Sequence, residues 1–95
     1  MIVTVDEIKS PLRIEHSDED AFLASLLTQA QAAAEDYCRV AFEDAEAPEA
    51  VKAAVKLMAC YHYEHPDMSD ATAYKAMRSA FECLLYPHRD EAKFF

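Results

Sequence analysis

The stretch from Pro48 to Glu64, PEAVKAAVKLMACYHYE, constrains the fold of this chain more than any other. On a helical wheel its polar positions Glu49, Lys52 and Lys56 share one narrow stripe, and nearly every other position is apolar. A helix that is apolar around most of its circumference must be covered on several sides. At ~1.5 Å per residue it spans roughly 25 Å, and it is too short and too charged to cross a membrane. We therefore expect the central helix of a small bundle, or a helix shared with neighbouring subunits.

The composition favours an all-α fold. The 95 residues include no glycine, and asparagine and tryptophan are also absent. Tight hairpins and left-handed helix caps favour glycine or asparagine, so an antiparallel sheet is disfavoured and helices should end by other means, chiefly at proline. Phosphate-binding loops, the dinucleotide fingerprint and the nucleophile elbow also need glycine. Several large classes of enzyme are therefore disfavoured.

Charge and cysteine content restrict the partners and the compartment. The net charge is −9, from 18 acidic and 9 basic residues. Such a surface repels nucleic-acid phosphate, although DNA could slide past it without adhering. The first residues lack the apolar core of a signal peptide. The chain has an odd number of cysteines, Cys38, Cys60 and Cys83, which do not form a disulfide framework. This fits synthesis in a reducing cytosol.

Prolines and capping residues predict a single domain of residues 1–95, with a tail over 88–95. They divide it into a bundle of about four helices, at residues 5–10, 18–39, 48–64 and 70–86. Thr4 and Glu7 form a capping box at the start of the first helix. Pro11 lacks the amide that a continuing helix needs, so this helix should stop or kink near Ser10.

The later helices are bounded in the same way. Ser17 is expected to cap the second helix, and Ser69 or Thr72 the fourth. Pro66 should end the third helix and Pro87 the fourth, because proline cannot continue a helix and pushes the preceding residue out of it.

No catalytic residue, metal ligand or cofactor-binding residue is predicted. Cys60, His62 and His65 are the only metal-ligating side chains close together, and spacings of two and five do not place them on one face of a helix. A half-buried aromatic girdle of Tyr61, His62 and Tyr63 explains this run more simply. The cysteines are expected to be small core residues, since a helix C-terminus disfavours a thiolate.

The pair Phe94-Phe95 leaves two interpretations open. Aromatic side chains near the end of a chain can fold back on the bundle, which is common for such segments. They can also anchor the chain in a groove of a partner, because exposed aromatic residues are frequent interface hot spots.

Three blocks of residues carry a family resemblance. The first comprises Thr4, Glu7, Lys9, Leu12, Arg13, Ile14, Asp18, Asp20 and Leu23. The second comprises Pro48, Val51, Lys52, Ala54, Tyr61, Tyr63 and Glu64. The third comprises Leu84, Leu85, Pro87 and Arg89. In this order the chain resembles the head–tail connector (adaptor) family of long-tailed double-stranded DNA phages and their prophages.

The resemblance implies a structural, non-enzymatic protein of the virion head–tail junction, made in the bacterial host cytoplasm. Its copies would form a ring, expected to be dodecameric, beneath the portal protein. The ring would extend the DNA channel and present a platform for the next head-completion or tail protein, with DNA only as passing cargo. No cofactor and no membrane contact are implied.

Two sets of site residues follow from that role. The segment expected to dock on the portal contains His88, Arg89, Phe94 and Phe95. Small or apolar helix positions are expected at the interface between subunits, namely Ala30, Ala33, Ala34, Val51, Val55 and Tyr63. Two other functions stay open: a small acidic helical regulator that binds one partner as a monomer or dimer, and a metal-dependent enzyme that uses His62 and His65.

Overall fold

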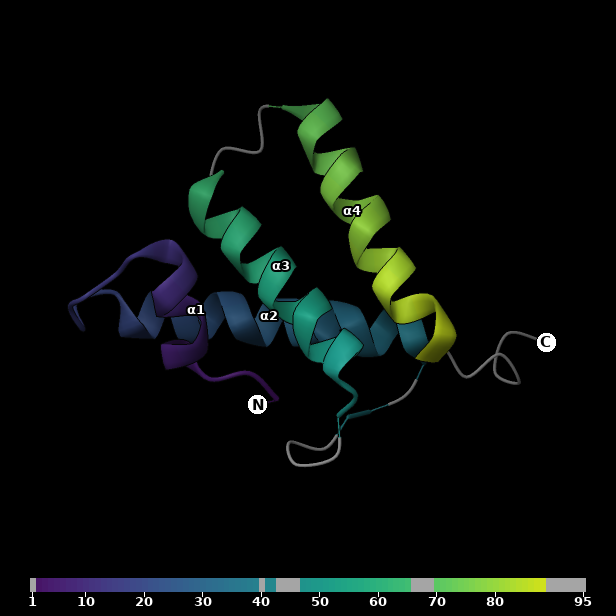
Figure 1. Ribbon diagram of the computed structural model, residues 1–95, viewed down its shortest axis with the longest axis horizontal. Coiled ribbons are helices and arrows are strands. Elements are labelled where there is room, and N and C mark those ends of the chain that lie inside the picture. Colours follow the sequence, from purple (N-terminus) through teal and green to yellow (C-terminus); the bar gives the residue numbers. More distant parts are fainter. Residues whose placement is uncertain (1, 40, 43–46, 66–69, 89–95) are drawn as a thin grey trace.

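The computed structural model describes residues 2–39, 41–42, 47–65 and 70–88, and the regular secondary structure within these ranges consists of helices alone (Figure 1). The helices are α1 (Val5–Leu12), α2 (Asp20–Cys38), α3 (Glu49–Glu64), α4 (Ala71–Leu85) and the short 3-10 helix η1 (Tyr86–His88). The prediction of four helices in an all-α bundle is confirmed.

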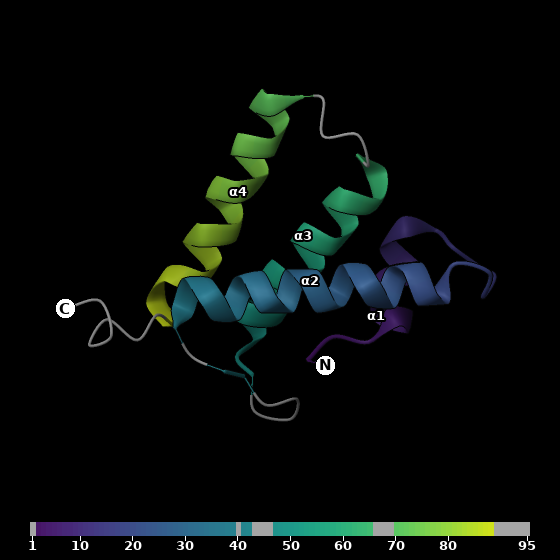
Figure 2. The same cartoon turned by 180° about the vertical axis from the view of Figure 1, so that it is seen from behind.

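Helix α3 is the central element, as predicted. It packs against each of α1, α2 and α4. In Figure 1 it crosses in front of α2, and in the reverse view of Figure 2 α2 lies in front of it. The molecule is flat, measuring 44 × 33 × 17 Å, so one side of α3 is not covered by another helix. The buried residues of α3 are Val51, Ala54, Val55, Met58, Ala59 and Tyr61.

The prediction for α1 was a stop or a kink near Ser10; the stop is wrong, because α1 continues through Pro11 to Leu12. Pro11 lies in the last turn and interrupts only one intrahelical hydrogen bond there. The helix ends instead in a Schellman-type turn. The Arg13 N–H donates to the Ser10 carbonyl over 3.1 Å, and the Ile14 N–H donates to the Lys9 carbonyl over 3.0 Å.

Two arginines adopt the left-handed conformation that the lack of glycine and asparagine was expected to exclude. Arg13 follows α1 with φ 61°, and Arg39 follows α2 with φ 60°. A residue with a Cβ pays about 1–2 kcal/mol for this conformation. The turn hydrogen bonds and the packing of Ile14 against the core offset this cost at Arg13. The prediction that helices end chiefly at proline is therefore wrong for α1 and α2.

The capping predictions had mixed outcomes. The Thr4 capping box is confirmed, with the Glu7 N–H donating to the Thr4 hydroxyl over 3.3 Å. Ser17 does not cap α2, which begins after Glu19 without a side-chain cap. Asp70 caps α4 by accepting the Ala73 N–H over 3.0 Å, so Thr72 does not, and Ser69 lies outside the described residues. Asp70 lies between the two expected caps in the sequence, and its carboxylate satisfies a free amide of the first turn.

One hydrophobic core joins the four α-helices. From α4 it takes Met77, Phe81 and Leu85, and Phe81 is fully buried. The Arg78 guanidinium lies 5.1 Å from the centre of the Phe81 ring. Ile2 and Val3, ahead of α1, are also buried, and the Ile2 N–H donates to Gln31 Oε1 of α2 over 2.9 Å.

Replacing the buried Phe81 should lower the stability of the fold much more than replacing the exposed Phe22. We expect Phe81→Ala to lower the free energy of unfolding by about 3–5 kcal/mol, because a buried ring is lost and a cavity remains. Phe22→Ala is the matched control, since Phe22 is 48% exposed, and it should cost about 1 kcal/mol or less. Urea denaturation followed by circular dichroism measures both. Equal losses in the two variants would contradict the observed packing of α4.

Candidate functional site

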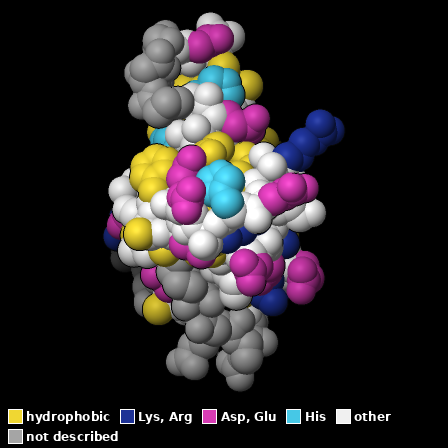
Figure 3. All heavy atoms as spheres, turned by 90° about the vertical axis from the view of Figure 1, so that its left-hand side faces the viewer, with side chains coloured by type: hydrophobic (Ala, Val, Ile, Leu, Met, Phe, Trp, Pro, Cys, Tyr) yellow, Lys and Arg dark blue, Asp and Glu magenta, His cyan; other side chains and the backbone are white. Residues whose placement is uncertain are grey.

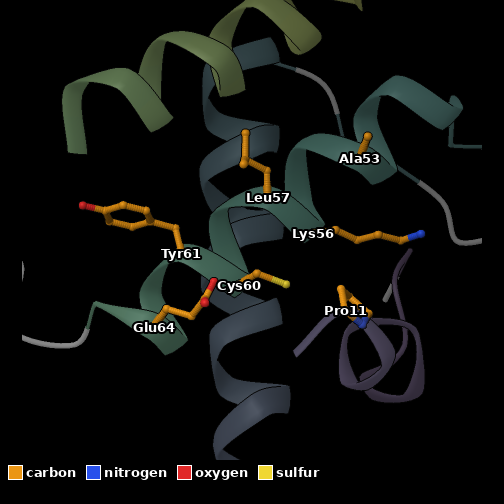
Figure 4. Close-up of a pocket in the computed structure, with 7 residues that line it drawn as sticks. All are labelled: Pro11, Ala53, Lys56, Leu57, Cys60, Tyr61 and Glu64. Carbon is orange, nitrogen blue, oxygen red and sulfur yellow. The ribbon is translucent and has the colours of Figure 1, made fainter. Parts of the chain in front are cut away.

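An apolar groove follows the uncovered side of α3 (Figure 4). It has a volume of about 420 Å³ and is open to solvent along its length. Its lining is a helical stripe of α3 together with Pro11 of α1: Pro11, Ala53, Lys56, Leu57, Cys60, Tyr61 and Glu64. The stripe arises because α3 is apolar around most of its circumference, whereas α1, α2 and α4 cover only part of it.

Ion pairs fix α1 as one wall of the groove. Lys56 Nζ of α3 lies 3.4 Å from Glu7 Oε2 of α1, and Lys9 of α1 pairs with Asp20 at the start of α2. The hydrogen bond from the Thr4 backbone, together with Lys56, lowers the pKa of Glu7 below its ordinary value of 4.5. The Glu7 carboxylate therefore connects the start of α1 to α3.

Aromatic side chains gather at the C-terminal end of α3. The Tyr61 and His65 rings stack with centroids 4.3 Å apart, and Tyr74 of α4 lies 6.1 Å from Tyr61. His62 makes an edge contact with Tyr61 at 5.9 Å, and partial burial lowers the pKa of its imidazole. Tyr63 is half-buried. The predicted aromatic girdle is present, and Tyr74 extends it to α4.

The described part of the chain holds no group of three or more His, Cys, Asp or Glu side chains placed to bind a metal ion. His62 and His65 make separate ring contacts around Tyr61. Within the same residues, no helix has the length and apolarity that crossing a membrane requires.

The three cysteines occupy different environments. Cys38 is buried, and its Sγ donates to the Leu85 carbonyl over 3.7 Å. Cys60 is half-buried in the groove, where burial and then the negative charge of Glu64 raise the pKa of its thiol. Cys83 is exposed, so the prediction that all three are core residues is wrong for it. It lines a shallow depression between α4 and Tyr37 of α2.

Most of the predicted interface residues lie inside the molecule. Ala30, Ala34, Val51 and Val55 are fully buried in the chain's own core. A neighbouring subunit cannot reach them in this conformation. Two of the predicted residues, Ala33 and Tyr63, are partly exposed.

The portal-docking residues are mostly outside the described ranges. His88 ends η1 and is half-buried. Arg89, Phe94 and Phe95 lie outside the described residues.

Sequence reasoning missed the groove itself. Because α3 is apolar on nearly every side, its sequence indicates that nearly every side should be covered. The three neighbouring helices leave one side of it open. The sequence does not show which face is left over, because that depends on how α1 and α4 are placed.

Acidic side chains are spread over the end of the molecule that contains α1 and the start of α2 (Figure 3). Asp6, Glu7, Glu15 and Asp18 are exposed there. An all-α chain with an acidic surface and an open apolar groove is typical of a small module that packs against other proteins.

The comparison with protein families identifies the class more closely. A family model described as "Phage gp6-like head-tail connector protein" matches residues 2–89. The chain therefore belongs to this family of phage structural proteins, which act as connectors at the head–tail junction of the virion. Comparisons with curated proteins and with solved structures gave no match.

The lowered pKa of Glu7 predicts how its contribution to the free energy of unfolding depends on pH. A carboxyl group whose pKa is lowered by folding stabilises the fold above its ordinary pKa, and this contribution disappears as pH falls through the folded value. At pH 7, Glu7→Gln should lower the free energy of unfolding by less than about 1 kcal/mol, since the pair is partly exposed. Below pH 4.5, the ordinary value, the difference from the wild type should shrink towards zero.

Urea denaturation curves recorded at steps of about one pH unit, from about pH 3 to about pH 7, measure this dependence. Glu15→Gln is the control, because Glu15 is exposed on the loop between α1 and α2. A difference between Glu7→Gln and the wild type that stays constant across this range would contradict the assigned role.

Proposed function

We propose that copies of this chain form a ring adaptor between the phage portal protein and the next head-completion or tail protein, and that this ring extends the DNA channel. The family match over residues 2–89 carries the proposal, because it covers all four helices. Residues 1–95 would act as one helical domain, with 88–95 as a tail.

The charge of the chain supports a channel role. At −9 it repels the phosphates of DNA, so a lumen lined by this surface lets DNA pass without adhering. The enzyme hypothesis is disfavoured by the family, whose members are structural, and by the separate ring contacts that engage His62 and His65.

The portal contact is proposed for residues 88–95. His88, Arg89, Phe94 and Phe95 combine positive charge with two aromatic rings, which are typical of interface hot spots. Between subunits, Ala33 and Tyr63 are the two predicted interface residues that reach the surface. Tyr63 lies beside the exposed Phe22, with ring centroids 6.2 Å apart.

Deletion of residues 88–95 tests the portal contact. We expect the shortened chain to bind isolated portal rings at least about tenfold more weakly, since a central aromatic anchor contributes 2 kcal/mol or more. Phe94→Ala with Phe95→Ala is the companion variant, because it removes the aromatic rings and leaves η1 intact.

Circular dichroism confirms that each variant is folded, and sedimentation with portal rings measures binding. Equal binding by the full-length and shortened chains would remove residues 88–95 from the contact. Failure of the full-length chain to bind portal rings at all would favour the acidic regulator over the ring adaptor.

A further inference from the structure

The two broad sides of the flat molecule present complementary surfaces. Figure 4 shows the residues that line the groove along α3, and in this view α2 passes behind α3. The opposite side, seen in Figure 2, is crossed by α2. One copy therefore carries a concave apolar strip on one side and a convex helix on the other.

The outward surface of α2 is unusual for so acidic a chain. From Ala21 to Ala34 there is no charged residue, although the whole sequence is 28% charged. Part of this run is nevertheless exposed, and we call these residues the α2 outer face: Ala21, Phe22, Ser25, Thr28, Gln29 and Ala32. The cores of protein interfaces are depleted of charged residues in the same way.

One polar side chain of the α2 outer face can be buried without losing its hydrogen bond. The Thr28 hydroxyl already donates to the Ala24 carbonyl over 2.9 Å. Its hydrogen bond is made inside the helix and can be kept when water is excluded. Phe22, 48% exposed, adds apolar area to this face.

The groove and the α2 outer face also match in length. From Ala53 to Glu64 and from Ala21 to Ala32 each strip spans eleven residue steps, or about 16 Å. The groove is lined mainly by apolar side chains, with Lys56 and Glu64 as its charged members. Small residues on an entering helix allow it to approach the groove floor closely.

We propose that the α2 outer face of one copy docks into the α3 groove of the next copy. The inference rests on the proposed ring and names the two surfaces that meet in it. Because these surfaces lie on opposite sides, each copy uses one with each neighbour, and such a head-to-tail contact can close into a ring.

Electrostatics favour the contact between the α2 outer face and the groove over a contact between the acidic ends of two copies. Two copies at −9 repel each other, so a contact between their acidic ends would place like charges together. The α2 outer face brings no charge into the contact. A two-fold contact between two α2 outer faces would leave both apolar grooves exposed to water.

Disulfide trapping tests the pairing in the full-length chain. Native Cys60 lies in the groove, and Cys83→Ser removes the exposed thiol. In this background Thr28→Cys, or Ser25→Cys one helical turn away, places a thiol on the α2 outer face. Oxidation with copper phenanthroline is carried out at alkaline pH, because burial and Glu64 raise the pKa of the Cys60 thiol.

We expect a ladder of dimers, trimers and larger species on a non-reducing gel, both in concentrated protein and on portal rings. Adding Cys60→Ser should abolish the ladder. A product that stops at dimers and persists with Cys60→Ser would show that two α2 faces pair, and would overturn the proposal.

A charge variant provides a second readout. Thr28→Glu should reduce assembly on portal rings at least tenfold, whereas the matched control Ala76→Glu, at an exposed position of α4, should leave it unchanged. If rings form without the cross-link and Thr28→Glu has no effect, the assigned surfaces are wrong and the ring adaptor stands. If neither rings nor cross-linked ladders form under any condition, both proposals fail.

Discussion

Burial of α3 is the constraint on which the rest of the structure depends. A helix that is apolar around most of its circumference is unstable in water unless other elements cover it. Here α1, α2 and α4 all pack on α3, and the core residues of the other helices face it. The bundle can be understood as the covering of this one helix by short neighbours, in a chain without the residues that make tight hairpins.

The covering is incomplete, and the uncovered strip connects fold with function. In a chain of this size the core is small, and three helices cannot enclose a fourth on every side. The remaining groove, floored by Leu57, Cys60 and Tyr61, is energetically costly in an isolated molecule. Under the proposed docking, a neighbouring copy covers this strip, and one sequence feature would then serve both folding and assembly.

Ion pairs contribute less to this arrangement than burial does. The Glu7–Lys56 and Lys9–Asp20 pairs hold α1 in place, but partly exposed pairs are worth only about 0–1 kcal/mol each. The N-terminal segment is attached mainly through Ile2, Val3 and Ile8, which are all buried. The excess of acidic side chains is therefore available for surface roles such as repelling DNA.

The sequence was sufficient to predict the helices mainly because their apolar spacing is regular, since α2 and α3 begin without a side-chain cap. Leu23 and Leu27 of α2, and Met77, Phe81 and Leu85 of α4, are buried at this helical spacing. The left-handed arginines were missed because tertiary packing outweighs a local conformational cost. Ala30 and Val55 were expected at a subunit interface because apolar periodicity cannot separate burial within a chain from burial between chains.

The groove could not be predicted for a related reason, since its walls depend on the placement of Pro11 and Leu57 from different helices. The most direct measurement of the central claim is amide hydrogen exchange of the free protein, resolved by helix. We predict that the buried segment of α3 around Val55 and Ala59 exchanges slowest, through global unfolding alone, and that α1 exchanges faster. Exchange of α3 at the rate of α1 would show that α3 is not the helix on which the fold depends.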